Sequence, residues 1–204
     1  MTQPTSRRRF PKSTASAGAA LAVANHAPAV LASTRPNETL GVAVIGVGTQ
    51  GHRLLQAVQA CEGTEVRVIC DLYAGNIKRA QGLCTNDKVR IVKEWERVVE
   101  DEDVDAVIVA VPDFMHARMT VAAAQNKKDV YVEKGWCVAL DEAKRMRAAV
   151  KENKVVMQLG HHYNSVPAMH KAREIFRSGA LGKVPLVRTY IDRSSSFPVW
   201  QFYT

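Results

Sequence analysis

The sequence predicts an α/β protein with a doubly wound parallel sheet, and two features of its 204 residues carry this prediction. From residue 39 onward, short apolar runs typical of buried strands alternate with amphipathic helical segments. The first apolar run ends in a glycine-rich turn that leads directly into a helical segment. Strands that alternate with helices in this way form βαβ units, and the strands of such units lie parallel.

The glycine-rich turn has the spacing of a dinucleotide-binding loop, G-x-G-x-x-G, directly after the apolar residues 42–45. Gly46 permits a tight turn, Gly48 lets a pyrophosphate approach the backbone, and Gly51 lets the following helix pack close to the strand. The N-terminus of that helix offers free N–H groups and a positive dipole to the phosphates. We therefore predict a Rossmann domain whose cofactor-binding loop comprises Gly46, Gly48, Thr49, Gln50 and Gly51.

A second apolar run, residues 66–70, ends at Asp71, about 20 residues beyond Gly51. A carboxylate there accepts hydrogen bonds from the ribose hydroxyls and repels a 2′-phosphate, which favours NAD over NADP. Asp71 could also cap the next helix, and the two roles are compatible. Lys78 and Arg79 keep NADP as the alternative cofactor. Cys70, at the end of the run, is predicted to lie in the core.

The alternation continues along the rest of the chain. The expected helices are residues 54–61, 76–83, 95–100, 117–125 and 141–152, and the further strands are residues 106–111, 130–132 and 155–159. A helix over 168–177 and a strand over 184–191 are expected to begin a second, α+β domain. The predicted division is a signal and linker over 1–38, the Rossmann domain over 39–165, and an incomplete second domain over 166–204.

Composition argues against several other classes of protein. Four of the basic residues that produce the net charge of +8 lie in the first 32 positions. The remaining charges are interspersed as on a solvated surface, so nucleic-acid binding is not expected. No apolar run is long enough for a membrane-spanning helix of a mature protein, so stable membrane insertion is not expected either. No cysteines follow a C-x-x-C pattern, and no cysteine–histidine cluster has zinc spacing, so no metal site is predicted.

The first 38 residues read as an export signal. A basic stretch at 6–12, S-R-R-R-F-P-K, precedes the Ala-rich residues 15–24 and a small-residue site near 30–32. The basic stretch resembles the bacterial twin-arginine signal S-R-R-x-F-L-K, with Pro11 in place of Leu. This route carries folded proteins, so we expect export to the periplasm or beyond. Because folding would take place in the reducing cytoplasm, the cysteines are expected to be free thiols. A basic disordered tail is the alternative.

Several stretches carry a family resemblance. They are V-I-G-V-G-T-Q-G at 44–51, V-A-V-P-D-F-M-H at 109–116, V-Y-V-E-K-G at 130–135, G-H-H-Y-N-S-V-P at 160–167 and I-F-R-S-G-A-L-G-K-V at 175–184. Together they resemble the Gfo/Idh/MocA oxidoreductases, the relatives of glucose–fructose oxidoreductase and inositol dehydrogenase. The resemblance runs from about residue 40 to the end of the chain. It implies hydride transfer between NAD(P) and a hydroxyl-bearing carbon of a sugar or polyol.

The resemblance also implies roles for single residues. The three glycines would hold the pyrophosphate and Asp71 the adenosine ribose, while Pro112, Asp113 and His116 would line the nicotinamide half of the site. A surface histidine at a helix start is the alternative for His116. Glu133 and Lys134 match the family's E-K-P motif and would also contact the cofactor. They stand at the carboxyl end of a strand, where such sheets bind their ligands.

Lys134 would hold a substrate hydroxyl and steady the alkoxide during hydride transfer, and an ordinary surface lysine is the alternative. Gly135 stands where the family has Pro, which removes a φ constraint from the Lys134 turn. His161 and His162 could face the substrate and take part in catalysis, or be partly buried and hydrogen-bonded. His170 is expected on the surface of the next helix.

In this family the second domain supplies an Asp/His general base and often mediates oligomers. We therefore expect the base beyond residue 204, homo-oligomers only for a full-length form, and dinucleotide binding with weak or no turnover by this chain alone. Two rival functions remain open. One is a hydrolase that uses NAD transiently to cleave glycosides, and the other is a non-catalytic nucleotide-binding fragment.

Overall fold

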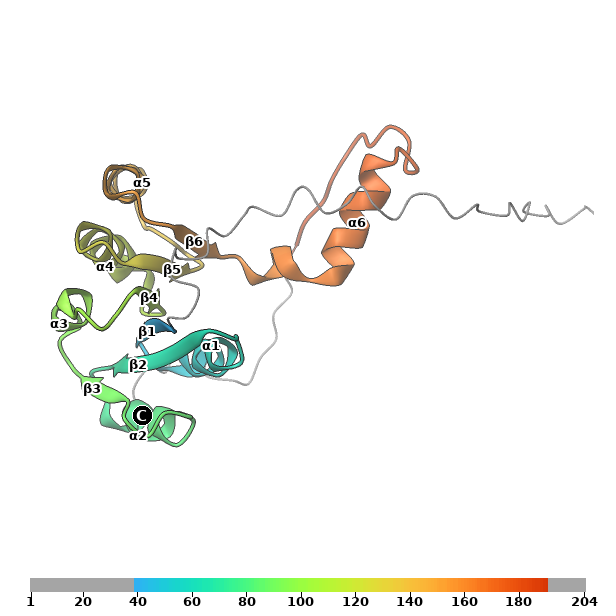
Figure 1. Ribbon diagram of the computed structural model, residues 1–204. Coiled ribbons are helices and arrows are strands. Elements are labelled where there is room, and N and C mark those ends of the chain that lie inside the picture. The colour runs from blue at the N-terminus through green and yellow to red at the C-terminus, as the bar shows by residue number, and fades with distance from the viewer. Residues whose placement is uncertain (1–38, 191–204) are drawn as a thin grey trace, which may run out of the picture. The chain divides into compact units, whose positions relative to one another are not determined.

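A computed structural model describes residues 39–190 of the chain (Figure 1). Strands and helices alternate along it, as the sequence predicts. The strands are β1 Leu40–Ile45, β2 Thr64–Cys70, β3 Arg90–Val92, β4 Ala106–Val109, β5 Asp129–Glu133 and β6 Met157–Gly160. The helices are α1 Thr49–Gln59, α2 Ala74–Gln81, α3 Trp95–Glu100, α4 Asp113–Gln125, α5 Leu140–Asn153 and α6 Pro167–Arg177, with a 3₁₀ turn at His162–Ser165.

The six strands form one parallel sheet in the order β3-β2-β1-β4-β5-β6. From β1 the chain builds outward through β2 and β3, and then returns to place β4 on the other side of β1. The strand order therefore reverses between β1 and β4. In open α/β sheets this switch point is where ligands bind, beyond the carboxyl ends of the strands. The predicted doubly wound Rossmann fold is confirmed.

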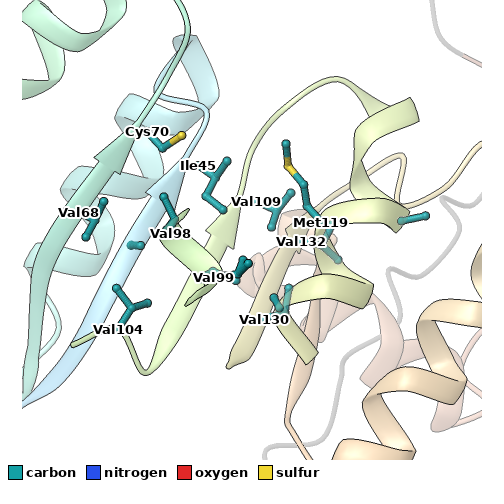
Figure 2. Close-up of a cluster of buried hydrophobic side chains, with 14 of the residues drawn as sticks. Ile45, Val68, Cys70, Val98, Val99, Val104, Val109, Met119, Val130 and Val132 are labelled. Carbon is teal, nitrogen blue, oxygen red and sulfur yellow. The ribbon is translucent and has the colours of Figure 1, made fainter. Parts of the chain in front are cut away.

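Each face of the sheet buries its own apolar cluster. One face packs against α3, α4 and α5, and Figure 2 shows Ile45, Val109 and Val132 of this face beside Val98 and Met119 of the helices. The other face packs against α1 and α2 through Val44, Leu55 and Ile77, among others. Figure 1 shows these two groups of helices on opposite sides of the sheet. Strands buried on both faces read as continuous apolar runs, which explains the sequence pattern.

A bulge in β2 alters the alternation of its side chains. Val42 pairs with Val66, but Ala43 pairs with Val68, so Arg67 is an extra residue opposite β1. The guanidinium of Arg67 donates to the carbonyl oxygens of Asp103, at 2.6 Å, and Thr39, at 3.2 Å. The bulge thus places Val66 and Val68 in different core clusters, although they are two residues apart.

Several predicted boundaries are wrong. Helix α4 begins at Asp113 rather than at residue 117, because Pro112 occupies the position before the first turn. Helix α2 begins two residues earlier than predicted, and β6 begins two residues later. Strand β3 was not predicted, because a three-residue edge strand carries little periodic signal. Residues 184–190 form no strand, and residue 191 lies outside the described residues.

The segment after β6 buries little. Every residue from 161 to 190 is exposed except Val166, and His170 on α6 is exposed as predicted. Among residues 39–190, no helix combines the length and apolarity that crossing a membrane requires. The predicted signal over residues 1–38 lies outside the described residues, so the proposed domain boundaries there stay predictions.

Candidate nucleotide-binding site

Most of the predicted site residues gather at the carboxyl edge of the sheet. The glycine loop follows β1, Asp71 follows β2, Pro112 precedes α4 after β4, and Glu133 ends β5. Because β1, β4 and β5 are neighbours in the sheet, the loops that follow them lie at one edge. The sequence places these residues up to 88 positions apart, from Gly46 to Lys134, and the parallel topology brings them together.

The glycine loop requires its glycines for two different reasons. Gly46 has a φ of +84°, and a Cβ there would lie 2.5 Å from the carbonyl oxygen of Ala110. A Cβ on Gly51 would lie on top of the carbonyl oxygen of Gly46. Among residues 39–190, a Cβ on Gly48 would instead meet only the Asn76 Nδ2 atom, at 3.8 Å. The fold itself therefore requires Gly46 and Gly51, whereas Gly48 leaves room beside the loop, as the approach of a pyrophosphate would need.

Helix α1 begins beside this open position. Gly48 precedes its first turn, which contains no acidic residue, and no side chain of the described residues caps the helix. The carbonyl oxygen of Gly48 accepts two hydrogen bonds from His52, from the backbone N–H at 2.9 Å and from ring Nδ1 at 2.7 Å. This fixes the peptide group that joins Gly48 to Thr49. A helix start with these properties suits an anionic phosphate group.

Asp71 connects three segments through its carboxylate. Oδ2 accepts the backbone N–H of Val47 in the glycine loop, at 2.9 Å, and Nδ2 of Asn76, at 3.2 Å. Oδ1 accepts the backbone N–H of Tyr73 at the start of α2, at 2.8 Å. Asp71 therefore supports the helix start, which was the alternative prediction, and also holds the glycine loop. Oδ1 keeps a lone pair for a ribose hydroxyl.

Glu133 is almost fully buried, with 4% of its surface exposed. Its carboxylate accepts hydrogen bonds from Gln50 Nε2 at 3.0 Å, from the backbone N–H of Lys134 at 3.1 Å, and from the hydroxyl of Tyr131. Burial, together with this carboxylate, raises the pKa of Tyr131. Glu133 thus ties the start of α1 to the turn after β5, and its partners are protein atoms.

Lys134 and the neighbouring Asp113 are exposed at this edge. Lys134 leads into Gly135, whose φ of +69° is one that proline cannot adopt. A Cβ on Gly135 would collide with the carboxylate of Asp113, so the missing side chain lets that carboxylate lie over the turn. The departure from the E-K-P motif therefore goes with a different turn geometry in this chain.

His116 is fully buried, so the surface alternative is wrong. Its ring lies between two backbone carbonyl oxygens, with Nδ1 at 2.9 Å from Gly135 and Nε2 at 2.8 Å from Val111. Both ring nitrogens are therefore occupied by the protein itself. The predicted contact between His116 and a cofactor has no support in this geometry, because the ring faces the two loops rather than the surface.

The two histidines after β6 stand apart from this network. Gly160 pairs with Glu133 in the sheet, so His161 follows directly beside the end of β5. Both His161 and His162 are exposed, and the ring of His162 lies 4.6 Å from that of Tyr163. Within the described part of the chain, neither side chain is hydrogen-bonded to Lys134 or Glu133. Their predicted catalytic role stays a prediction.

Among residues 39–190, no group of three or more His, Cys, Asp or Glu side chains could hold a metal ion. The residues at the edge fit a dinucleotide instead. An open position at Gly48, an uncapped helix start and a carboxylate 25 residues beyond Gly46 are the features that such a ligand uses.

Comparison with known sequences agrees with this geometry. A sequence model of the oxidoreductase family with an NAD-binding Rossmann fold, GFO_IDH_MocA, matches residues 40–161. The match covers more than half of the chain and includes every strand of the sheet. The chain belongs to the Gfo/Idh/MocA oxidoreductase family. The predicted family and its NAD cofactor are thereby confirmed.

Individual members of the Gfo/Idh/MocA family also match long stretches of the chain. A scyllo-inositol 2-dehydrogenase (NAD(+)) of Bacillus subtilis is 28% identical over 165 residues, which are 78% of this chain and 46% of that protein. A glycosyl hydrolase family 109 protein of Solibacter usitatus is 32% identical over 151 residues, which are 68% of this chain and 34% of that protein. The crystal structure of myo-inositol 2-dehydrogenase from Lactobacillus plantarum superposes with a TM-score of 0.67 at 22% identity, over 72% of this chain and 43% of that one, and shares its fold. The chain therefore spans less than half the length of these relatives.

Sequence reasoning missed three residues of this Gfo/Idh/MocA site. His52 holds Gly48, Asn76 holds Asp71, and Tyr131 holds Glu133. None belongs to the motif that identifies the loop. A partial signal existed for Tyr131, which is two residues before Glu133 on the same strand and therefore points to the same face.

Proposed function

We propose that this protein is an NAD-dependent oxidoreductase acting on a hydroxyl-bearing carbon of a sugar or polyol. One observation carries the proposal: the hydrogen bond between Gln50 and Glu133 joins the glycine loop to the turn with Lys134. A dinucleotide on the start of α1 would therefore extend along the edge that carries the exposed Lys134. The polyol named for the Bacillus subtilis relative supports this substrate class.

The residues of the chain divide the work between binding and chemistry. The loop from Gly46 to Gly51 would hold the pyrophosphate, and Asp71 the adenosine ribose. When bound, NAD supplies the hydride acceptor or donor. The Lys134 ammonium would donate a hydrogen bond to the reacting hydroxyl oxygen and stabilise its developing negative charge. Removal of the hydroxyl proton would require a general base in addition to Lys134.

Calorimetric titration of residues 33–204 with NAD and with NADP tests the binding half of the proposal. We expect saturable binding of NAD and weaker binding of NADP, because the carboxylate of Asp71 repels a 2′-phosphate. NADP bound as tightly as NAD would contradict the assigned preference. Folded protein that binds neither nucleotide would contradict the proposal as a whole.

Replacement of Lys134 tests the chemical half of the proposal, in a protein of the same length as the relatives. Lys134→Ala should leave the Kd for NAD within about twofold and lower kcat for hydride transfer by about 10²-fold or more. Lys151→Ala, on the exposed surface of α5, is the matched control. An unchanged kcat in Lys134→Ala would assign the residue to the ordinary surface.

Glycoside hydrolysis with transient use of NAD is the second candidate function, and the Solibacter usitatus relative supports it. Such an enzyme would release a sugar from a glycoside without net accumulation of NADH. A dehydrogenase would accumulate one NADH for each molecule oxidised. Measuring both products in one reaction separates the two functions. Nucleotide binding without either reaction, unaffected by Lys134→Ala, would favour the non-catalytic alternative.

Export by the twin-arginine route is part of the same proposal. The support is the S-R-R-R-F-P-K stretch at residues 6–12 followed by a weakly apolar, Ala-rich segment. Residues 1–38 fused to a reporter that folds in the cytoplasm should direct it to the periplasm. Replacing Arg7 and Arg8 by Lys together should stop this transport, whereas replacing Lys12 by Arg should not. Export that survives the double change would contradict this route.

A further inference from the structure

His116 has an unusual environment for a buried histidine. The residue lies in the first turns of α4 with none of its surface exposed. Nδ1 lies 2.9 Å from the carbonyl oxygen of Gly135, which follows β5, and Nε2 lies 2.8 Å from that of Val111, which follows β4. One side chain thus spans the two loops that follow neighbouring strands.

Both partners of the ring are acceptors. A carbonyl oxygen has lone pairs and no proton, so each ring nitrogen must carry an N–H to form a hydrogen bond. A neutral imidazole has one N–H and would turn a bare nitrogen toward the second oxygen. Because the site is fully buried, water cannot relieve that repulsion, and an unpaired buried acceptor is costly. A ring with an N–H on both nitrogens satisfies both carbonyl groups.

We propose that His116 is a positioning residue for the turn that carries Lys134, and that it acts by donating a hydrogen bond from each ring nitrogen. The turn is held from two sides. Glu133, bonded to Gln50 of α1, accepts the backbone N–H of Lys134, and His116 of α4 donates to the carbonyl group of the next residue. The backbone at Lys134 is therefore fixed between α1 and α4 while its side chain is exposed.

Asp113 supplies a negative charge close to this arrangement. It lies three residues before His116 on α4, so the two side chains leave the helix on the same face. Its carboxylate lies over Gly135, in the space that a Cβ would fill. Gly135 therefore lets the Asp113 carboxylate lie near the His116 ring. A ring that donates from both nitrogens is positively charged, and a buried charge is tolerated where an opposite charge is near.

The chemical significance of a fixed Lys134 rests on the proposed function, but the contact itself does not. The direct test is nuclear magnetic resonance of the full chain, labelled with ¹⁵N and free of nucleotide. Correlation of ring carbon-bound protons with ring nitrogens distinguishes a ring with two N–H groups from one with a single N–H. We expect two N–H groups on His116 at pH 7. A single N–H would overturn the proposal.

Assignment does not depend on one variant. His116→Gln should remove the His116 signal directly. If that variant fails to fold, the other five histidine signals can be assigned one at a time, and the remaining signal then belongs to His116. The variants for this are His26→Gln, His52→Gln, His161→Gln, His162→Gln and His170→Gln. The wild-type spectrum then still decides the protonation of the ring. A failed search for oxidoreductase activity leaves this measurement unaffected, so the two proposals fail separately.

Hydrogen exchange tests the positioning role. His116→Gln should speed exchange of the Lys134 amide, which is bonded to Glu133, by about tenfold relative to β1 amides, since about one net hydrogen bond at the turn is lost. His116→Asn, whose amide nitrogen stands close to the position of Nδ1, keeps a donor for the Gly135 carbonyl group and should retain most of this protection. A uniform rise at Lys134 and in β1 would mean that His116 only stabilises the fold, and would overturn the positioning role. His170→Gln on exposed α6 is the control.

Discussion

The carboxylate of Asp71 accepts the backbone N–H of Val47, with 2.9 Å between Oδ2 and N. This bond joins the residue after β2 to the loop after β1. The same carboxylate accepts the N–H of Tyr73 and so supports the start of α2. The acid that the motif assigns to the ribose is therefore also a structural part of the loop that would hold the pyrophosphate. Loss of Asp71 should affect both halves of the adenosine diphosphate site.

Asp71→Ala should consequently reduce both nucleotide affinity and stability. We expect the Kd for NAD to rise at least about tenfold and the free energy of unfolding to fall by about 1–3 kcal/mol, because the N–H groups of Val47 and Tyr73 lose their acceptor. Calorimetric titration and urea unfolding measure the two effects. Asp87→Ala, at an exposed position near the other end of α2, should change neither. Wild-type affinity in Asp71→Ala would exclude the assigned ribose contact.

Alanine at two glycines of the loop should separate binding from folding. Gly48→Ala should leave the melting temperature nearly unchanged, since its Cβ would meet only the Asn76 amide at 3.8 Å, but should weaken NAD binding by about tenfold or more by occupying the space of the pyrophosphate. Gly51→Ala should instead unfold or strongly destabilise the domain, because its Cβ would collide with the Gly46 carbonyl group. Gly48→Ala with normal NAD affinity would contradict the placement of the pyrophosphate.

The glycine motif could be predicted because its spacing is a local property of the chain. The spacing follows from the tight turn and the close helix packing of a single strand–turn–helix unit, although Gly46 also meets the carbonyl oxygen of Ala110 after β4. The sheet order could be expected in outline, because continuous apolar runs separated by helices imply parallel strands. The bulge at Arg67 could not be predicted, since it depends on which residues of β1 pair with β2.

The surroundings of His116 could not be predicted for a related reason. The sequence places it at the start of a helix, where exposure is common. Its burial depends on the carbonyl groups of Val111 and Gly135, one of which belongs to another strand's loop. The same holds for Glu133, whose partner Gln50 is 83 residues away. Long-range pairing of polar groups leaves no periodic pattern in a sequence.

Thr120 offers a test of packing away from the site. Its side chain on α4 has no exposed surface, and its hydroxyl oxygen has no hydrogen-bond partner among the described residues. A buried hydroxyl without a partner costs free energy, and valine has nearly the same shape. Thr120→Val should therefore raise the free energy of unfolding by about 1 kcal/mol. Thr120→Ser keeps the hydroxyl, loses a methyl group and should destabilise. A less stable valine variant would mean that the hydroxyl has a partner in solution.

Cys70 should be chemically inert in the folded protein. Burial, and then the carboxylates of Asp71, Glu94 and Glu96, raise the pKa of its thiol to about 12. Only the thiolate reacts with alkylating reagents, so iodoacetamide at pH 8 should modify exposed Cys61 and leave Cys70 unmodified until the protein is unfolded. Peptide mass spectrometry measures both. Equal labelling of the two cysteines in native protein would contradict the burial of Cys70.

The same raised pKa makes stability depend on pH in a fixed direction. Below the ordinary thiol pKa, near 9, Cys70 is protonated in both the folded and the unfolded chain and has no effect. Between about pH 9 and 12 the unfolded chain releases this proton while the folded chain retains it, so unfolding becomes more favourable by up to about 1.4 kcal/mol per pH unit. Urea unfolding at pH 8 and at pH 10 should therefore show a larger loss of stability for wild type than for Cys70→Ala. Comparing each protein at the two pH values removes the constant cost of the smaller side chain and leaves only the contribution of the thiol. Equal losses in the two proteins would mean that the thiol ionises as readily in the folded as in the unfolded chain.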